Sequence, residues 1–170
     1  MNLRGLVDED IANYHKTSMF LIFPTCSFKC EKECDQKICQ NSSLANAPIV
    51  KITPEEICER YINNPLTSAI VCGGLEPFDT KFDLITFVDC LRRRYSCNDD
   101  IVIFTGYTEE ELKDVNNSII HFIYTSLKSY PNIIIKYGRY IPNRSPHYDE
   151  VLGVTLASDN QYAKRLDDEN

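Results

Sequence analysis

Four cysteines lie close together in a short polar segment of the sequence. Within fourteen residues the chain carries Cys26, Cys30, Cys34 and Cys39, directly after an apolar run that is typical of a buried strand. Most of the intervening residues are polar or charged, so the segment is too hydrophilic to bury four thiols as small core residues. Thiolates are ligands for zinc and for iron–sulfur clusters. The residue types and their density therefore predict a metal centre in the loop 24–48.

Two kinds of metal centre are compatible with such a loop. Four thiolates form a closed tetrahedral shell around one structural zinc ion, but zinc sites favour two-residue gaps between paired cysteines. The gaps here are three, three and four residues. A four-iron cluster usually takes four cysteines, and with three thiolates one iron stays open for a substrate or cofactor. The spacing favours the cluster over zinc.

A second candidate feature is a pair of glycines that follows another apolar run. The run 68–72 is followed by Gly73-Gly74-Leu75-Glu76-Pro77. Glycine allows a ligand to approach the backbone closely, and carbonyl and carboxylate oxygens are the acceptors that an ammonium group needs. A tight turn between strand and helix is the simpler interpretation, because Gly-Gly turns are common. Next to the cysteine loop, the motif predicts a small molecule bound beside the metal centre.

The elements that must position both motifs alternate between strand and helix. Short apolar runs predict strands at 19–23, 68–72, 101–104 and 133–135. Capping signals and helical periodicity predict helices that begin at Thr53–Glu56 and Thr108–Glu111 and that cover 79–95 and 118–127. The segment from Val151 is expected to add one strand and a short last helix. Alternating elements indicate a mainly parallel sheet whose ligands gather at the carboxyl ends of the strands, where both motifs lie.

Composition narrows the class of protein. A chain of 170 residues with 43% hydrophobic residues is expected to fold as one domain, 1–170. The net charge of −7 argues against a nucleic-acid surface. No apolar run approaches the roughly 20 residues that cross a bilayer, and the N-terminus is too acidic for a signal peptide. We therefore expect a cytoplasmic protein without a membrane partner, in which eight cysteines indicate metal or redox chemistry rather than disulfides.

The cysteine loop resembles the signature of the radical S-adenosylmethionine (SAM) superfamily. Cys26-x3-Cys30 with a later Cys39-Gln40-Asn41 is similar to the Cys-x3-Cys-x2-Cys loop of that superfamily. In the activating proteins of anaerobic ribonucleoside-triphosphate reductase, His-Asn commonly follows the loop. Here eight residues, including Cys34, separate the second and third matching cysteines. The resemblance implies that Cys26, Cys30 and Cys39 hold a [4Fe-4S] cluster, with Cys34 as the alternative third ligand.

Three further segments carry the same resemblance. Gly73–Pro77 is similar to Gly-Gly-Glu-Pro, which meets the amino group of SAM, and here Leu75 is an extra residue. Thr105–Leu112 is similar to the Thr-Gly-Tyr-Thr-x-Glu-Glu-Leu segment of the activases, and the late 158–161 is similar to Ser-x-Asn-Gln. A strand end and a helix cap are the alternative interpretations of these two segments. The cofactor-binding residues that the resemblance implies are Gly73, Gly74, Glu76, Pro77, Thr105 and Asn160.

The resemblance also implies a fold and an activity. The fold is an α/β incomplete parallel β/α barrel in a single compact domain. The reduced cluster cleaves SAM to methionine and a 5′-deoxyadenosyl radical, and this radical takes a hydrogen atom from a glycine of a partner. The implied partners are anaerobic ribonucleotide reductase, or a similar glycyl radical enzyme, and an electron donor such as flavodoxin. No catalytic residue is expected beyond the cluster ligands, and the small chain leaves little material for a lid over a small substrate.

Two other functions stay open at this stage. One is a cluster-binding or zinc-binding module for electron transfer or sensing, without radical chemistry. The other is a radical SAM sister branch with another substrate, which the departures at the cysteine loop and at Leu75 make possible. Lys136, Arg139 and Arg144 follow the last predicted strand and either pair with a carboxylate or partner, or are ordinary solvated charges. The four remaining cysteines are expected to pack as small apolar side chains: Cys58, Cys72, Cys90 and Cys97.

Overall fold

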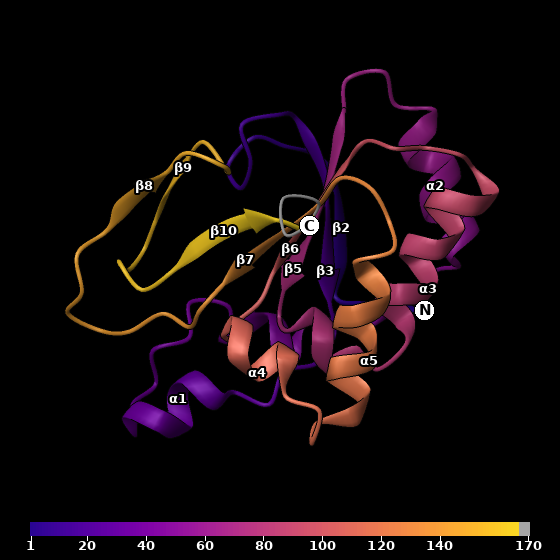
Figure 1. Ribbon diagram of the computed structural model, residues 1–170. Coiled ribbons are helices and arrows are strands. Elements are labelled where there is room, and N and C mark those ends of the chain that lie inside the picture. The colour runs from indigo at the N-terminus through magenta and orange to yellow at the C-terminus, as the bar shows by residue number, and fades with distance from the viewer. Residues whose placement is uncertain (167–170) are drawn as a thin grey trace.

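The computed structural model describes residues 1–166 and shows a mixed α/β domain built on a six-stranded sheet (Figure 1). The strand order is β10-β7-β6-β5-β3-β2. Four central strands run parallel: β3 (Ser18–Phe23), β5 (Ala69–Gly74), β6 (Asp100–Phe104) and β7 (Ile133–Tyr137). The sheet confirms the mainly parallel arrangement that alternating strands and helices predict.

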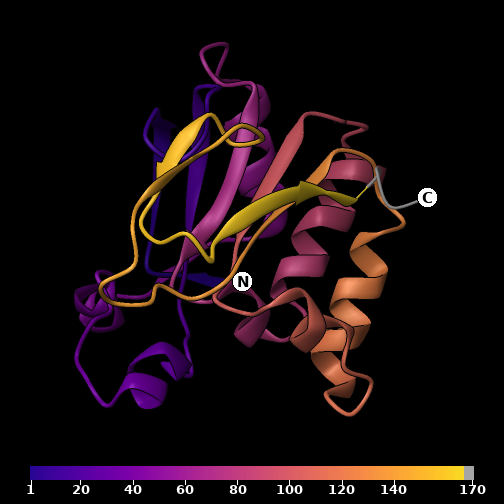
Figure 2. The same ribbon diagram turned by 60° about the vertical axis from the view of Figure 1, so that its left-hand side comes forward.

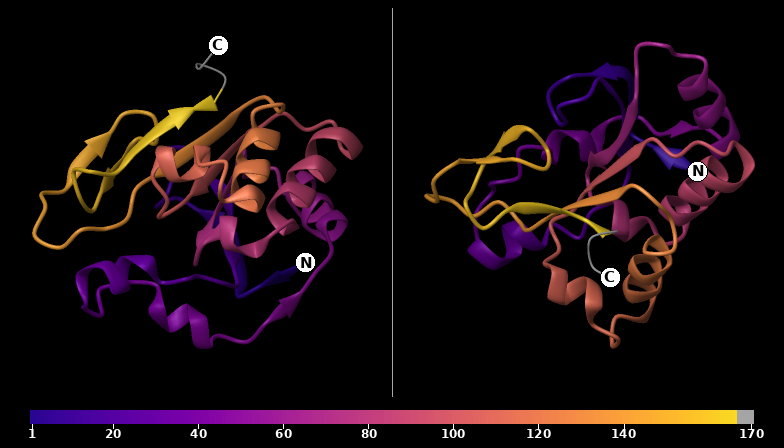
Figure 3. Two further views of the ribbon diagram at one scale, coloured as in Figure 1. Left: turned by 60° about the horizontal axis from the view of Figure 1, so that its bottom comes forward. Right: turned by 45° about the horizontal axis from the view of Figure 1, so that its top comes forward.

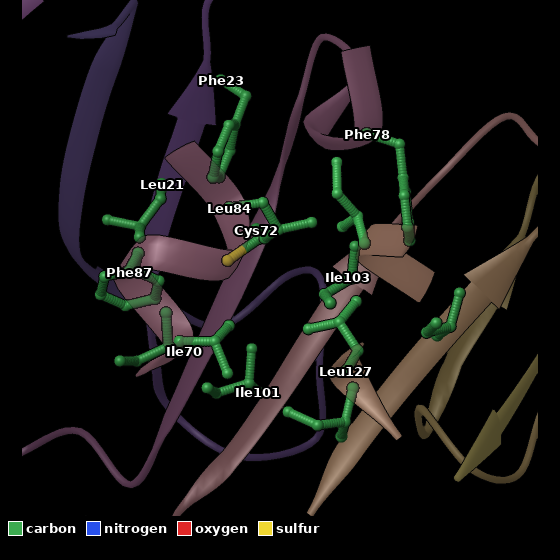
Figure 4. Close-up of a cluster of buried hydrophobic side chains, with 14 of the residues drawn as sticks. Leu21, Phe23, Ile70, Cys72, Phe78, Leu84, Phe87, Ile101, Ile103 and Leu127 are labelled. Carbon is green, nitrogen blue, oxygen red and sulfur yellow. The ribbon is translucent and has the colours of Figure 1, made fainter. Parts of the chain in front are cut away.

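Helices cover one face of the sheet (Figure 2). They are α2 (Pro54–Ile62), α3 (Asp83–Asp89), the π-helical turn η3 (Cys90–Arg94) and α5 (Ser118–Leu127). Every second residue of the central strands points to this face, where Leu21, Ile70 and Cys72 pack against Leu84 and Phe87 (Figure 4). Burial of β-branched and aromatic side chains on a pleated surface stabilises such a layer.

A long connection covers the other face. Between β7 and β10 (Tyr162–Arg165), the segment 138–161 forms the hairpin of β8 (His147–Asp149) and β9 (Val154–Leu156). Its Leu152 and Leu156 pack with Val71 and Val102 of the sheet in a second, smaller core. The segment 138–161 therefore covers the face of the sheet opposite the helices.

Helix starts follow the capping signals of the sequence. Thr53 accepts a hydrogen bond from the backbone N–H of Glu56 at 3.1 Å and donates, through its own N–H, to the carboxylate of Glu56 at 2.7 Å. Thr108 and Glu111 repeat this capping box at α4 (Glu109–Lys113). Two donors of each first turn are satisfied in this way, which fixes where the two helices begin.

The segment 79–95 does not form the single continuous helix that the sequence predicted. The chain forms a 3₁₀ turn, η2 (Pro77–Thr80), then α3 and η3. Lys81 has φ +59°, which is incompatible with a right-handed helix and separates η2 from α3. The apolar face of the segment is nevertheless correct, because Leu84, Val88 and Leu91 are fully buried.

Short elements before the expected segment at Val151 were not predicted, and neither was the antiparallel pairing at the two edges of the sheet. β2 (Gly5–Asp10) pairs antiparallel with β3, and β10 pairs antiparallel with β7. Two-residue strands β1 (Asn2–Leu3) and β4 (Val50–Lys51) also pair, and the cysteine loop contains α1 (Lys29–Cys34) and η1 (Ser42–Asn46). These segments lack the continuous apolar runs that mark buried parallel strands, so periodicity does not reveal them.

Three smaller expectations have mixed outcomes. Cys58, Cys72 and Cys90 are buried as expected, whereas Cys97 is half-buried. The one strand expected from Val151 onward is found as two strands, β9 and β10. The expectation of a short last helix falls on residues that include 167–170, which lie outside the described part of the chain. In the described part of the chain, no helix has the length and apolar character needed to cross a membrane.

Candidate functional site

A cavity of about 480 Å³ lies at the carboxyl edge of the parallel strands. Its wall combines the cysteine loop, the ends of β5, β6 and β7, and the covering segment 138–161. In Figure 1, α1 of the cysteine loop and α4, which follows β6, lie at the same end of the sheet, and Figure 3 shows the cysteine loop as a separate layer below that end. The volume is in the range of small-molecule sites, and its position is where parallel sheets place ligands.

Three of the four clustered thiols line this cavity. They belong to Cys26, Cys30 and Cys39. The Sγ of Cys26 accepts a hydrogen bond from the backbone N–H of Phe28 at 3.2 Å, and Phe28 has φ +51°. Burial raises the pKa of Cys26 to about 12 and also raises the pKa of Cys30. The thiols of Cys26 and Cys30 are therefore protonated at neutral pH without a metal, and metal binding must release their protons.

Cys34 has a different environment. It is the last residue of α1, and its Sγ donates to the carbonyl of Cys30 at 3.1 Å. Cys34 does not line the cavity, whereas Cys39 does. Glu31 holds the Cys39 segment, because its Oε1 accepts the backbone N–H of Cys39 at 3.1 Å. The helix thus directs one thiol back along its own axis and leaves the later cysteine at the cavity wall.

Asp79 ties the cysteine loop to the rest of the site. Its Oδ2 accepts the backbone N–H of Ser27 at 2.6 Å, and its Oδ1 accepts the hydroxyl of Tyr107 at 2.6 Å. The ammonium of Lys29 lies 4.4 Å from the centre of the Tyr107 ring. A charge-assisted hydrogen bond to the residue after Cys26 fixes the position of that thiol.

The two glycines are required by close packing between strands. A Cβ at Gly74 would lie 2.5 Å from Cγ2 of Ile22, and the φ of Gly74 is +87°. A Cβ at Gly73 would lie 3.1 Å from the ring of Phe20. Both glycines line the cavity, so the backbone of β5 is open to a ligand there. Leu75, the extra residue of the motif, also lines the cavity and is 7% exposed.

Glu76 is a buried carboxylate that connects two strand ends. Its Oε1 accepts from the Thr105 hydroxyl at 2.8 Å and from the Phe78 N–H at 3.2 Å, and its Oε2 accepts from the Gly106 N–H at 2.8 Å. Burial raises its pKa to about 7, against the hydrogen bonds from Gly106 and Thr105, which lower it. A carboxylate has about four acceptor positions, so three donors leave one, on Oε2, for a ligand.

Lys136 brings a positive charge to the same cavity. It lies in β7, is 7% exposed, and lines the cavity wall. Its Nζ donates to the carbonyl of Gly138 at 2.8 Å and lies 5.9 Å from the centre of the Phe104 ring. Burial lowers its pKa to about 8, and the charge of Glu76 acts in the opposite direction. Lys136 is therefore not a solvated surface charge.

The other two cations near β7 differ from Lys136. Arg139 is bound to Glu111 at 2.6 Å and to Glu33 of the cysteine loop at 3.5 Å. Arg144 forms an exposed pair with Asp159 at 2.9 Å. Arg144 is therefore an ordinary solvated charge, whereas Lys136 and Arg139 are not.

The structure brings most of the sequence-predicted residues together but not all of them. The residues that line the cavity are Cys26, Cys30, Cys39, Gly73, Gly74, Glu76 and Thr105. Pro77 and Asn160 are not among the lining residues. Pro77 begins η2, and the side-chain N–H of Asn160 donates to the carbonyl of Arg139 at 2.8 Å. Gln161, its neighbour, lines the cavity in its place. The Thr105 hydroxyl is already engaged by Glu76 and by the N–H of Tyr107.

Sequence reasoning missed two kinds of wall residue. Lys136 was noticed as a charge but not as a buried one, and its position as the one charged residue in an apolar strand was the available signal. Residues 154–157 of the covering hairpin line the cavity, and no motif marks them.

The donor set agrees with an iron–sulfur cluster. Three thiols line one cavity that also has room for a small molecule, and a backbone amide already donates to one sulfur. Within residues 1–166, no three His, Cys, Asp or Glu side chains are grouped so that they could hold a single metal ion. In a cluster each thiolate binds a separate iron, so its ligands do not converge on one point.

Comparison with known proteins identifies the family. A family model described as a 4Fe-4S single cluster domain matches residues 16–132, which is more than half of the chain. The match includes the cysteine loop, the glycine motif and Thr105 and ends before β7. Parallel comparisons gave no match to a curated protein or to a solved structure. The chain therefore belongs to the 4Fe-4S single cluster domain family, a family associated with radical SAM proteins.

Proposed function

We propose that this protein is a radical SAM enzyme of the type that activates glycyl radical enzymes. The observation that carries the proposal is the shared cavity of three thiols and the Gly73–Glu76 segment. Family membership supports a [4Fe-4S] cluster at the thiols. The ligands we propose are Cys26, Cys30 and Cys39, and the small molecule we propose beside them is SAM.

The residues of the chain bind and orient the cofactors, which supply the redox chemistry. When bound, the reduced cluster supplies the electron that cleaves SAM to methionine and a 5′-deoxyadenosyl radical. Three protein thiolates leave one iron position for SAM. The open backbone at Gly73 and Gly74 and the remaining acceptor position of Glu76 suit the SAM ammonium group. The covering segment contributes residues 154–157 to the cavity wall.

The proposed substrate is a glycine of a partner protein. The activase type rests on the resemblance of Thr105–Leu112 and of the glycine motif, with anaerobic ribonucleotide reductase or a similar glycyl radical enzyme as the partner. An electron donor such as flavodoxin completes the proposal. The open edges of the sheet at β2 and β10 are compatible with the partial barrel that belongs to this proposal.

Cysteine variants test the cluster. After anoxic reconstitution, we expect about four irons and four sulfides per chain and a Mössbauer spectrum in which one iron site differs from the others. Cys26→Ala, Cys30→Ala and Cys39→Ala should each lose most of the cluster. Cys34→Ala is the matched control and should keep it, because Cys34 lies off the cavity wall. A colourless protein with one zinc, or a cluster saturated by four protein sulfurs, would contradict the proposal.

Product analysis tests the reaction. The reduced protein should convert SAM to 5′-deoxyadenosine and methionine, and Glu76→Gln should weaken SAM binding while the iron content stays the same. Incubation with a candidate anaerobic reductase should generate a glycyl radical signal in electron paramagnetic resonance. SAM cleavage without a radical on any glycyl radical enzyme would favour the sister branch with another substrate.

A further inference from the structure

The cysteine loop contributes no residue to either hydrophobic core. None of the residues 25–50 is buried, and both core clusters are built from other parts of the chain, in agreement with the separate layer that the loop forms in Figure 3. The helix α1 has six residues, none of them buried, and Phe28 at its start supplies no side-chain cap. An isolated helix of this length is unstable in water. Contacts other than apolar packing must therefore hold α1 in place beside the cavity.

The helix α1 carries two opposite charges that meet an ion pair of the main domain. Lys29 and Glu33 are four residues apart, so they lie on one side of the helix. The ammonium of Lys29 is 3.5 Å from Oε1 of Glu111, and Oε2 of Glu33 is 3.5 Å from Nε of Arg139. Glu111 and Arg139 are themselves joined at 2.6 Å. The four side chains form a network of alternating charge that begins and ends on α1.

The inner pair of this network is better shielded and better fixed than the charges on α1. The side chains of Arg139 and Glu111 are 10% and 32% exposed, whereas those of the two α1 residues are 40% and 60% exposed. Glu111 also accepts the backbone N–H of Thr108 at 2.9 Å in the capping box of α4. Burial alone would raise the pKa of Glu111, but hydrogen bonds from Arg139 and Thr108 lower it, so the carboxylate is charged at neutral pH. The fold thus presents a preset pair of charges to a helix that it does not bury.

We propose that Glu111 is a positioning residue that docks α1 of the cysteine loop against the strand ends through Arg139 and Lys29. Asp79 holds the loop at Ser27, and the charge network holds the segment that follows. This docking is a property of the protein without a cluster. Its consequence for a cluster rests on the proposed function, because a docked loop keeps the three thiols at one cavity and an undocked loop separates them.

Hydrogen exchange of the cluster-free full chain tests the docking. Glu111→Gln keeps a side-chain oxygen that can accept the Thr108 N–H but removes the negative charge. We expect the backbone amides of 29–39 to exchange about fivefold faster in this variant, while the central strands stay protected. The matched control is Glu56→Gln, because Glu56 has the same place in the capping box of α2, with Thr53 as its partner. The control should leave the exchange of the cysteine loop unchanged.

Salt and a second variant separate the role of charge from local damage to α4. An increase in salt from about 0.05 M to about 0.5 M shortens the screening length, so it should accelerate the exchange of α1 in wild type but not in Glu111→Gln. Lys29→Gln removes a charge on the loop side and leaves α4 intact, and it should reproduce the effect of Glu111→Gln. Lys29→Arg keeps the charge and should behave as wild type. If Glu111 only capped α4, the Lys29 variants would not differ from each other.

Iron release from the reconstituted protein tests the consequence for the cluster. A chelator should remove iron about fivefold faster from Glu111→Gln than from wild type or Glu56→Gln, and equal rates in the three proteins would overturn the role in holding the cluster. If the chain takes up no cluster but the exchange results hold, the proposed function fails and the docking stands. If α1 exchanges equally in wild type, Glu111→Gln and Lys29→Gln at low salt, the charge network does not position the loop and the proposal is overturned.

Discussion

Asp100 and Lys136 are buried charges on adjacent strands at opposite ends of the sheet, and they differ in how many hydrogen-bond partners the protein provides. Asp100, at the start of β6, accepts from Tyr14 at 2.9 Å, from Lys16 at 2.5 Å and from Arg165 at 2.9 Å. Lys136, near the end of β7, has one carbonyl acceptor at 2.8 Å. A charge that is fully satisfied within the fold stabilises it, whereas a charge left with unfilled donors at a cavity is available for a ligand.

The largest expected effect comes from removing the satisfied charge. Asp100→Asn should destabilise the protein by about 2–3 kcal/mol, because it removes the negative charge and replaces one acceptor oxygen of a 5% exposed carboxylate with a donor that faces the donors of its partners. The matched control is Asp8→Asn, which breaks a pair with Arg60 whose side chains are 40% and 50% exposed and should cost less than about 1 kcal/mol. Urea unfolding measures both. Equal effects would show that Asp100 is no more important than a surface charge.

The second prediction concerns the effect of Glu76 on stability as the pH approaches neutrality. Burial raises the pKa of Glu76 from 4.5 to about 7, so the folded protein holds a proton that the unfolded chain has lost. The stability of the ligand-free protein should therefore fall as the pH rises from about 4.5 to 7, by about 2 kcal/mol. Glu76→Gln, which cannot ionise, should remove this slope. If the variant showed the same fall in stability between pH 4.5 and 7 as wild type, the fall would belong to another titrating group.

A somewhat smaller effect concerns Asp100 at acid pH. Burial alone would raise its pKa, but hydrogen bonds from Arg165, Lys16 and Tyr14 outweigh burial and lower the pKa to about 2. The stabilisation is present above the unfolded pKa of about 4 and is lost as the pH falls towards 2, which amounts to about 1–2 kcal/mol. In Asp100→Asn this acid dependence should be reduced, and urea unfolding between these pH values would show it. If the variant lost stability between pH 4 and pH 2 as steeply as wild type, this loss could not be attributed to Asp100.

The smallest expected effect concerns the anchor of the cysteine loop. Tyr107→Phe removes the 2.6 Å hydrogen bond to Asp79 and should cost about 1 kcal/mol. Asp79 keeps its bond to Ser27, so the loop should loosen without unfolding. We expect a chelator to remove iron from the reconstituted variant faster than from wild type. Tyr148→Phe, at a 62% exposed position, is the control, and equal rates in all three proteins would exclude an anchoring role.

Much of the fold follows from local sequence patterns. The strands β3, β5, β6 and β7 are continuous apolar runs, and both capping boxes give the first residue of their helices. The break at Lys81 and the antiparallel edges could not be found in this way. Their conformations depend on contacts with distant parts of the chain, such as the pairing of β10 with β7, and not on local periodicity.

The candidate site also has some features that the sequence predicts and others that depend on the tertiary structure. The density of thiols identified the cysteine loop, and the glycine motif identified the segment that lines the same cavity beside it. The choice between Cys34 and Cys39 at the cavity depends on α1, which turns the Cys34 thiol towards the carbonyl of Cys30. The burial of Lys136 depends on the packing around the ends of the strands, which no local pattern describes.

The sequence by itself determined the chemistry that is available: soft thiolate donors in one loop, a carboxylate after paired glycines, and strands that end at one edge of the sheet. Only the tertiary structure decided which of these groups share a cavity and which charges lack partners. The physical reason is that donor chemistry belongs to a single residue. Burial and hydrogen bonding, in contrast, depend on segments such as 138–161 that reach the site from far along the chain.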